Sequence, residues 1–369
     1  MQRTLLSSAS LASRWSLRYS VKHGLPVALC CALLLLAGEE KQLASRPCGA
    51  GMHPLWTALA VAQLWLASDM DKTLAFYDGQ EEGRSVVALP ASSGTGKVGK
   101  VGVKTLDLLA EIESVLPQRL VCVSGQRAAT MHQRQAFFPM IKYWLCENGG
   151  RLFVRDDDDP TLLREDSSFA ERLFHAAHSA PASFSDACRE LEDFGRELEK
   201  KRGAVVDAKG YATMLRVKLA AGDDEFSPKD LPAALSCTHN LGFLDVTLRG
   251  IDKASALALL IAEKRSVGDD SPSEYLYFGD DDNDVGAAAA SCEAYIAHEH
   301  SAAMRAWLRG QRTIVTVDGA VAETKTTTAD AAPPPQTSSS PRFVALSAEP
   351  GPAGCAALLA LALRRLRAE

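Results

Sequence analysis

The segment that decides the fold is 60–73, AVAQLWLASDMDKT. Its first part is a mostly apolar run with the length of a buried strand. The run ends in a polar turn that contains Asp69 and Asp71. Two later segments follow the same pattern, since 119–123 runs into Ser-Gly-Gln-Arg and 273–278 runs into Gly-Asp-Asp-Asp-Asn-Asp. The sequence therefore predicts three buried strands, each followed by a polar loop.

Helical patterns separate these strands. Residues 105–116 carry apolar side chains at helical spacing between the first two strands. Strands that alternate with helices favour a parallel sheet with helices on both faces. The carboxyl ends of such strands share one edge of the sheet, where ligands bind. We expect an α/β protein with a Rossmann-like, three-layer core and one crevice lined by the three polar loops.

The composition excludes several classes of protein. With 369 residues, 47% of them hydrophobic and 23% charged, the chain is long enough for two or three globular domains. Its 40 Lys and Arg against 46 Asp and Glu give a net charge of -6, which disfavours nucleic acid as a partner. The nine cysteines include no C-x-x-C pair. This pattern predicts buried thiols in a reducing compartment, without disulfides or a zinc site.

The first 51 residues differ from the rest of the chain. Residues 1–38 contain basic and serine side chains but no acid, which is typical of a transit peptide. We therefore expect targeting to a plastid or mitochondrion, with the cytoplasm as the alternative. The uncharged apolar run at 25–38 is shorter than the roughly 20 residues that span a membrane. A membrane tether is an alternative that this length disfavours.

Changes in pattern divide the chain into six predicted segments. A helix-rich and then strand-like stretch interrupts the core, and a Thr, Ala, Pro and Ser tract near the end lacks apolar periodicity. The segments are a leader (1–51), the first part of the core (52–150), an inserted α+β cap (151–250), the second part of the core (251–322), a flexible linker (323–341), and a closing strand and helix (342–369).

Acidic side chains gather in the first and third polar loops. Asp69 and Asp71 are two residues apart, a spacing that points both carboxylates of an extended chain the same way. Two such acids repel each other unless a cation neutralises one of them. The loop at 279–284 supplies further oxygen ligands, and an all-oxygen site suits Mg²⁺. The sequence therefore predicts a magnesium site between these loops.

Two further residues suit the binding of a phosphoryl group. Ser124 offers a hydroxyl in the second polar loop. Lys253 offers a positive charge at the start of a probable helix. Neither residue is specific by itself, and the order of all the motifs along the chain carries the interpretation.

In this order the motifs resemble those of the haloacid dehalogenase superfamily of phosphatases and phosphotransferases. The D-x-D-x-T motif is at 69–73, the second motif is Ser124, the third is Lys253 and the G-D-x-x-N-D motif is at 279–284. The E-N-G-G segment at 147–150 further resembles members with a type-two cap, which include the Cof-type, sucrose-phosphatase-like and phosphomannomutase-like groups. The resemblance covers roughly residues 60 to 320.

The resemblance implies a division of roles between two carboxylates. Asp69 would attack phosphorus and form an aspartyl-phosphate. Asp71 would protonate the leaving oxygen and then deprotonate the attacking water. Mg²⁺ would be bound by Asp69, the backbone carbonyl of Asp71, and Asp280. Asp284 or Asp281 would support the ion.

The phosphoryl group and the remainder of the substrate would contact different parts of the chain. The resemblance implies that the phosphoryl oxygens bind Ser124, Gly125, Lys253 and Asn283. Weaker candidates for contacts from the cap are Tyr211, Met214, Arg216 and Arg249.

Two features near the first motif are less typical. Lys72 stands where many relatives carry glycine, although the family pattern leaves that position free. Residues 82–102 are longer than a minimal turn and predict a flap. Within them, 94–100 contains most of a nucleotide-binding glycine loop, but Val101 stands where a Ser or Thr would hold Mg²⁺. We therefore expect part of a flap there and no nucleotide site.

The function expected from these features is a Mg²⁺-dependent phosphatase that acts on a small phosphate ester, most simply a sugar phosphate. Two alternatives stay open. One is a phosphomannomutase-like phosphotransferase. The other is a non-catalytic module that binds phosphorylated metabolites in the same crevice. The sequence leaves the substrate and the oligomeric state open.

Overall fold

The structure is a computed structural model of the chain. The residues that it describes are 64–77, 85–91, 96–178, 183–202, 204–218, 231–240, 243–265, 274–298, 300–311, 313–318, 321–325 and 341–368. All of them belong to one compact unit, Ala60–Glu369. The predicted leader, 1–51, lies outside the described residues, so its targeting role stays a prediction. None of the helices in the described part is long and apolar enough to cross a membrane.

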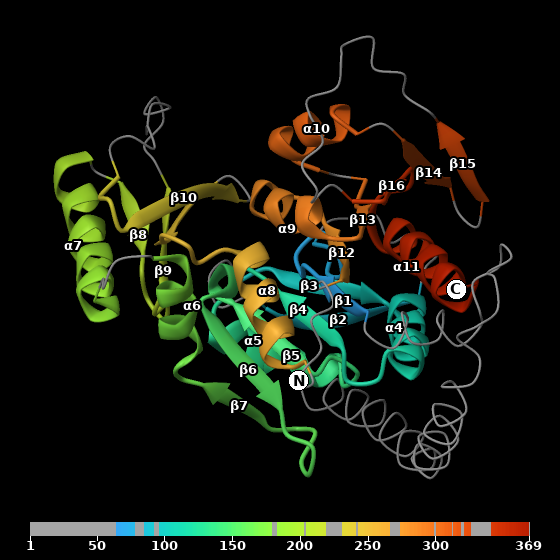
Figure 1. The fold of residues 1–369 in the computed structure, drawn as a ribbon, viewed down its shortest axis with the longest axis horizontal. Helices are drawn as coiled ribbons and strands as arrows, with labels where there is room; N and C mark the ends of the chain where they lie inside the picture. Colours follow the sequence, from blue (N-terminus) through green and yellow to red (C-terminus); the bar gives the residue numbers. More distant parts are fainter. Residues whose placement is uncertain are drawn as a thin grey trace, which may run out of the picture. The chain divides into compact units, whose positions relative to one another are not determined.

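A ten-stranded sheet forms the core (Figure 1), in the order β15-β14-β16-β13-β12-β1-β4-β5-β6-β7. The run from β14 to β5 is parallel, whereas β15, β6 and β7 pair antiparallel at the two ends. The strands are β1 (Trp65–Ser68), β4 (Leu120–Val123), β5 (Tyr143–Cys146), β6 (Arg151–Arg155), β7 (Leu163–Asp166), β12 (Tyr275–Gly279), β13 (Glu293–Ile296), β14 (Ile314–Asp318), β15 (Val321–Lys325) and β16 (Phe343–Ser347).

Helices cover both faces of this sheet, which explains why the central strands are continuous apolar runs. Every residue of β1, β4, β5, β12 and β13 is buried, as expected for strands covered on both sides. One face packs against α4 (Val103–Val115), α5 (Ala128–Arg134) and α11 (Gly351–Ala368). The other packs against α8 (Lys253–Glu263), α9 (Val285–Ala290) and α10 (Ala302–Arg309). The predicted three-layer α/β core is confirmed.

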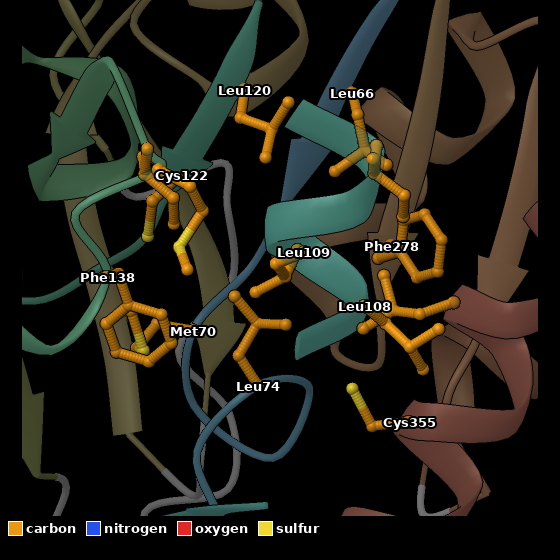
Figure 2. Close-up of a cluster of buried hydrophobic side chains, with 14 of the residues drawn as sticks. Leu66, Met70, Leu74, Leu108, Leu109, Leu120, Cys122, Phe138, Phe278 and Cys355 are labelled. Carbon is orange, nitrogen blue, oxygen red and sulfur yellow. The ribbon is translucent and has the colours of Figure 1, made fainter. Parts of the chain in front are cut away.

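Figure 2 shows the first of these faces. Leu66 and Leu120 from the central strands meet Leu108 and Leu109 of α4, with Cys355 of α11 beside them. A buried leucine side chain contributes about 1.5–3 kcal/mol through removal from water. This packing fixes the positions of β1 and β4 in the sheet, and therefore the positions of the polar turns that follow them. Cys122 and Cys355 are buried free thiols.

A hairpin follows β1. It consists of β2 (Val86–Ala91) and β3 (Val98–Gly102), which pair antiparallel. The described part of the predicted flap is therefore a β-hairpin. Of the segment that resembled a nucleotide-binding loop, residues 98–100 belong to β3, and residues 94 and 95 lie outside the described residues. A strand in this position supports the expectation of a flap.

The cap is a second, smaller α+β region. Its antiparallel sheet has the order β10-β11-β9-β8 and packs against α7, beside α6. Figure 1 shows these strands beside α7, away from α4 and α11. The elements are α6 (Phe169–Ala177), α7 (Phe184–Arg202), β8 (Val205–Asp207), β9 (Met214–Lys218), β10 (Leu235–Asn240) and β11 (Phe243–Leu248).

Two predicted boundaries differ from the structure. The range predicted for the cap, 151–250, includes β6 and β7, which extend the large sheet because the chain turns back antiparallel after β5. The range predicted for the linker, 323–341, includes the end of β15, and 326–340 lies outside the described residues. The closing strand and helix predicted at 342–369 are β16 and α11. β16 lies between β13 and β14, which both precede it in the chain.

Candidate active site

The three polar loops meet at one edge of the large sheet, because β12, β1 and β4 are adjacent and parallel. Asp69 follows β1, Ser124 follows β4 and Asp280 follows β12. The cavity at this edge is lined by Asp69, Asp71, Ser124, Gly125, Arg216, Asn240, Asp280 and Asp281. The expected crevice is therefore present, and the cap strands contribute Arg216 and Asn240 to it.

Lys253 brings a positive charge beside this cavity. It is the first residue of α8, whose N-terminus is capped by Asp252 accepting a hydrogen bond from the backbone of Ser255 at 2.8 Å. The Lys253 Nζ donates to Asp69 Oδ1 at 2.7 Å and to Asp284 Oδ1 at 2.6 Å. Burial lowers the pKa of Lys253, but the two carboxylates outweigh burial and raise it above its ordinary value. The lysine is therefore a permanent cation.

Three buried carboxylates gather here, and Lys253 contacts two of them. Oxygen atoms of Asp69, Asp280 and Asp284 lie within 4.8 Å of one another. Burial raises the pKa of Asp69 to about 8, although Lys253 lowers it. Burial, together with Asp284 and Asp69, also raises the pKa of Asp280 well above its usual range. The unbalanced negative charge and the all-oxygen donor set fit a divalent cation such as Mg²⁺.

Asp284 holds this cluster together. Its Oδ1 accepts hydrogen bonds from Lys253 and the Tyr277 hydroxyl, and its Oδ2 accepts from the backbone N–H groups of Asp280 and Asp281, each at 3.0 Å. A carboxylate has about four acceptor positions, so these four donors occupy Asp284. The geometry therefore favours a supporting role for Asp284 over direct contact with an ion.

Asp71 lines the cavity but stands outside this group of three carboxylates. Its Oδ1 accepts a hydrogen bond from Arg134 Nη1 at 3.0 Å and another from the Tyr77 hydroxyl. Neither partner was expected from the sequence. Arg134 ends a short helix where a basic residue is ordinarily solvated, so no local pattern marks it as buried.

The phosphate-binding residues expected from the sequence are only partly together. Ser124 and Gly125 line the cavity. A Cβ atom on Gly125 would lie 2.8 Å from Asn240 Nδ2, so glycine permits the close approach of the cap. Asn283 is not among the lining residues, and its Nδ2 donates to Asn148 Oδ1 at 2.9 Å. The phosphate-binding role of Asn283 stays a prediction.

The cap presents a hydrogen-bonded group to the cavity. Arg216 of β9 donates through Nε to Asp245 Oδ1 at 2.6 Å and through Nη2 to Asp245 Oδ2 at 2.9 Å. Asn240 of β10 donates to Asp245 Oδ2 at 2.7 Å, and Asn148 of the core donates to the same oxygen at 3.2 Å. Asp245 is fully buried. It therefore orients two side chains that line the cavity and links them to the core.

The other cap candidates have different surroundings. Tyr211 lies under the guanidinium of Arg127, whose Cζ is 4.8 Å from the ring centroid. Met214 is buried in the cap, and Arg249 donates to a backbone carbonyl of β10. Arg216 is thus the one of the four candidates that lines the cavity.

Lys72 adopts the left-handed conformation, with φ of 63°. Its backbone N–H donates to the carbonyl of Ala75 at 2.7 Å and closes the turn after β1. Glycine reaches this conformation without strain, which explains physically why a glycine suits this position. The turn forms here despite the side chain.

No family model matches the sequence, and no curated protein matches it. Similar solved structures include a Thermoplasma acidophilum protein, at 12% identity and a TM-score of 0.46, over 83% of this chain and 100% of that chain. A second is a HAD subclass IIB sugar phosphatase, at 12% identity and 0.42, over 66% and 91%. A third is a HAD-superfamily phosphatase from Bacteroides thetaiotaomicron, at 15% identity and 0.42, over 88% and 100%. Phosphatases of the HAD superfamily are therefore among the structures to which this chain is similar, at low identity.

Proposed function

We propose that this protein is a haloacid dehalogenase-type phosphatase that uses Mg²⁺ to hydrolyse a small phosphate monoester. One observation carries the proposal. Asp69, Asp280 and Lys253 come from distant parts of the chain and converge at the carboxyl ends of adjacent strands. A surplus of buried carboxylates around one lysine suits a site that binds a metal cation and a phosphate together.

Electrostatics explains why these cations are needed. Two unit charges 4 Å apart repel by about 4 kcal/mol at an effective dielectric constant of 20, which opposes the approach of a carboxylate to a phosphate dianion. Lys253 reduces this repulsion and fixes Asp69 through its Oδ1. Asp69 and Asp280 would hold Mg²⁺, which when bound supplies further neutralisation of the phosphate charge.

Two proton transfers and two displacements complete the proposed reaction. An oxygen of Asp69 forms a bond to phosphorus while the bond to the leaving oxygen breaks, and Asp71 gives that oxygen a proton. A water molecule then attacks the phosphorus of the aspartyl-phosphate and gives a proton to Asp71, which frees inorganic phosphate and restores Asp69. Ser124 and the backbone at Gly125 lie where they can orient the phosphoryl oxygens.

The cap supports a hydroxyl-rich leaving group. Arg216 keeps N–H groups beyond the two that bind Asp245, and Asn240 keeps its amide oxygen. Because Asp245 balances the charge of Arg216, these groups suit neutral hydroxyls better than a second anion. This favours a sugar monophosphate as substrate, and it favours hydrolysis over a mutase reaction that would bind a sugar bisphosphate.

The test is phosphate release by the purified full chain. We expect turnover of 4-nitrophenyl phosphate and of members of a sugar-phosphate panel in the presence of Mg²⁺, and its loss with a chelator. Asp69→Ala should abolish turnover, whereas Asp158→Asn, a change in an exposed loop, should leave it intact. Binding of phosphate esters without turnover would instead favour the non-catalytic module, and bisphosphate-dependent isomerisation would favour the mutase.

A further inference from the structure

The Asp71 carboxylate forms an ion pair with a buried arginine, Arg134. The Arg134 side chain is 0% exposed and that of Asp71 is 20% exposed, so one end of Asp71 lies within the protein while the residue lines the cavity. Its Oδ1 accepts from both Arg134 and the Tyr77 hydroxyl. Among the described residues no hydrogen bond to Asp71 Oδ2 is present.

The β2–β3 hairpin covers this pair. Arg134 Nε lies 3.4 Å from the carbonyl of Pro90 in β2 and donates to it. A Cβ atom on Gly99 of β3 would lie 3.4 Å from Arg134 Nη2 and 3.4 Å from Tyr77 Cε1. The hairpin backbone therefore packs directly on the arginine and the tyrosine, which keeps water away from the guanidinium of Arg134.

Burial makes this arrangement rigid. An arginine remains charged in proteins, and a buried guanidinium without a carboxylate partner is strongly destabilising. The planar guanidinium also fixes direction better than a lysine would. With Oδ1 engaged by two donors, rotation of the Asp71 carboxylate would break both hydrogen bonds. The same contacts are compatible with a purely structural role, in which the pair only fastens the hairpin.

We propose that Arg134 and Tyr77 are positioning residues that present Asp71 Oδ2 to the leaving oxygen of the substrate. This inference rests on the proposed function. When the bond between phosphorus and the leaving oxygen breaks, the proton passes from Asp71 Oδ2 to that oxygen. The two positioning residues are not among those that line the cavity, and they act through the side-chain carboxylate of Asp71.

Leaving groups of different basicity separate positioning from a structural role. An alkoxide needs a proton as it leaves, whereas 4-nitrophenolate leaves readily without one. We therefore compare kcat/KM for butyl phosphate and 4-nitrophenyl phosphate. Because general acid catalysis contributes about 10²–10⁴-fold, Tyr77→Phe should lower turnover of butyl phosphate by about tenfold or more, with a clearly smaller loss for 4-nitrophenyl phosphate. Asp71→Asn sets the upper limit of this selectivity.

Two more variants complete the experiment. Arg134→Lys keeps the positive charge but loses the planar guanidinium with its fixed donor directions. If this variant folds, it should show the same selective loss. Tyr275→Phe is the matched control, because it removes another buried hydroxyl, one that bonds to the carbonyl of Ala287 at 2.9 Å. It should leave the ratio of the two substrates unchanged.

The outcomes distinguish this inference from the proposed function. A Tyr77→Phe enzyme with equal losses on both substrates, or with none, overturns the positioning role while the phosphatase proposal stands. Full activity of Asp69→Ala on both substrates overturns both proposals. A selective loss in Tyr77→Phe but not in Tyr275→Phe supports the positioning role.

Discussion

The core edge and the cap each place buried carboxylates beside a cation, but in different proportions. At the core edge, three carboxylates lie close together and Lys253 contacts two of them. In the cap, the single carboxylate of Asp245 is matched by Arg216 and two amides. When all three carboxylates are ionised, the core therefore has a surplus of negative charge that a proton or a metal ion would relieve, whereas Arg216 balances the charge of Asp245 in the cap. Unbalanced charge thus suits a region to chemistry, and balanced charge suits a region to recognition.

The largest effect is expected from removal of the cation of the core. Lys253→Met leaves Asp69 and Asp284 buried without their partner, which should destabilise the fold by about 3–5 kcal/mol. Loss of one preorganised stabilising group should also lower kcat by about 10²–10³-fold or more. Chemical denaturation and phosphate release measure the two effects. If the variant kept both stability and activity, the surplus charge at the core would have no functional meaning.

The cap should respond differently to a comparable change. Arg216→Met removes a recognition group but leaves Asp69, Lys253 and Asp280 untouched. We expect kcat/KM for sugar phosphates to fall by about 10- to 100-fold, mainly through KM, and the rate with 4-nitrophenyl phosphate to change much less. Steady-state kinetics on both substrates test this. A fall in kcat for both substrates would place Arg216 in the chemistry and erase the distinction between the regions.

The protonation of Asp69 gives a third test, which does not depend on activity. Its pKa is raised by burial to about 8, above the ordinary value of 3.8. The metal-free fold thus gains stability from this proton at low pH and loses that contribution as the pH rises toward 8. Mg²⁺ competes with the proton. We expect Mg²⁺ to raise Tm more at pH 8 than at pH 5.5, as measured by calorimetry. The pH dependence of the increment should become smaller in Asp69→Asn, where Asp280 is left to exchange its proton for Mg²⁺.

The smallest effect is expected at Lys72. Replacement by glycine removes the steric cost of the left-handed backbone conformation, about 1–2 kcal/mol, and this gain is offset by the entropy that glycine loses on folding, about 0.5–1 kcal/mol. We expect a net gain of about 0.5–1 kcal/mol in the free energy of unfolding. Gln118→Gly is the control, since Gln118 has φ of 58° away from the cavity. Destabilisation by Lys72→Gly alone would show that the lysine side chain makes a favourable contribution.

The sequence predicts the core edge better than the cap for a physical reason. Continuous apolar runs identify β1, β4 and β12, and parallel pairing then brings their end residues together without further information. Asp69 and Lys253 are 184 positions apart and nevertheless meet as expected. The motifs identify the site residues, and the pairing of the strands brings these residues close to one another.

The contacts that the sequence did not predict are made by side chains whose sequence neighbours give no sign of a special role. Arg134, Tyr77 and Asp245 carry no motif, and each gains its meaning only from the packing of a helix, a hairpin or the cap sheet against the site. The cap boundary failed for a related reason. Whether β6 and β7 extend the large sheet or join the cap depends on which edge is free, which local periodicity does not encode.

The place of β16 has a consequence for synthesis of the protein. Since β16 lies between β13 and β14, those two earlier strands cannot join into one sheet until residues 343–347 have emerged from the ribosome. A nascent chain that stalls before this point exposes two open strand edges to chaperones and to other chains. Quality control during translation is therefore expected to act on this protein late, when all the residues that line the cavity have already been made.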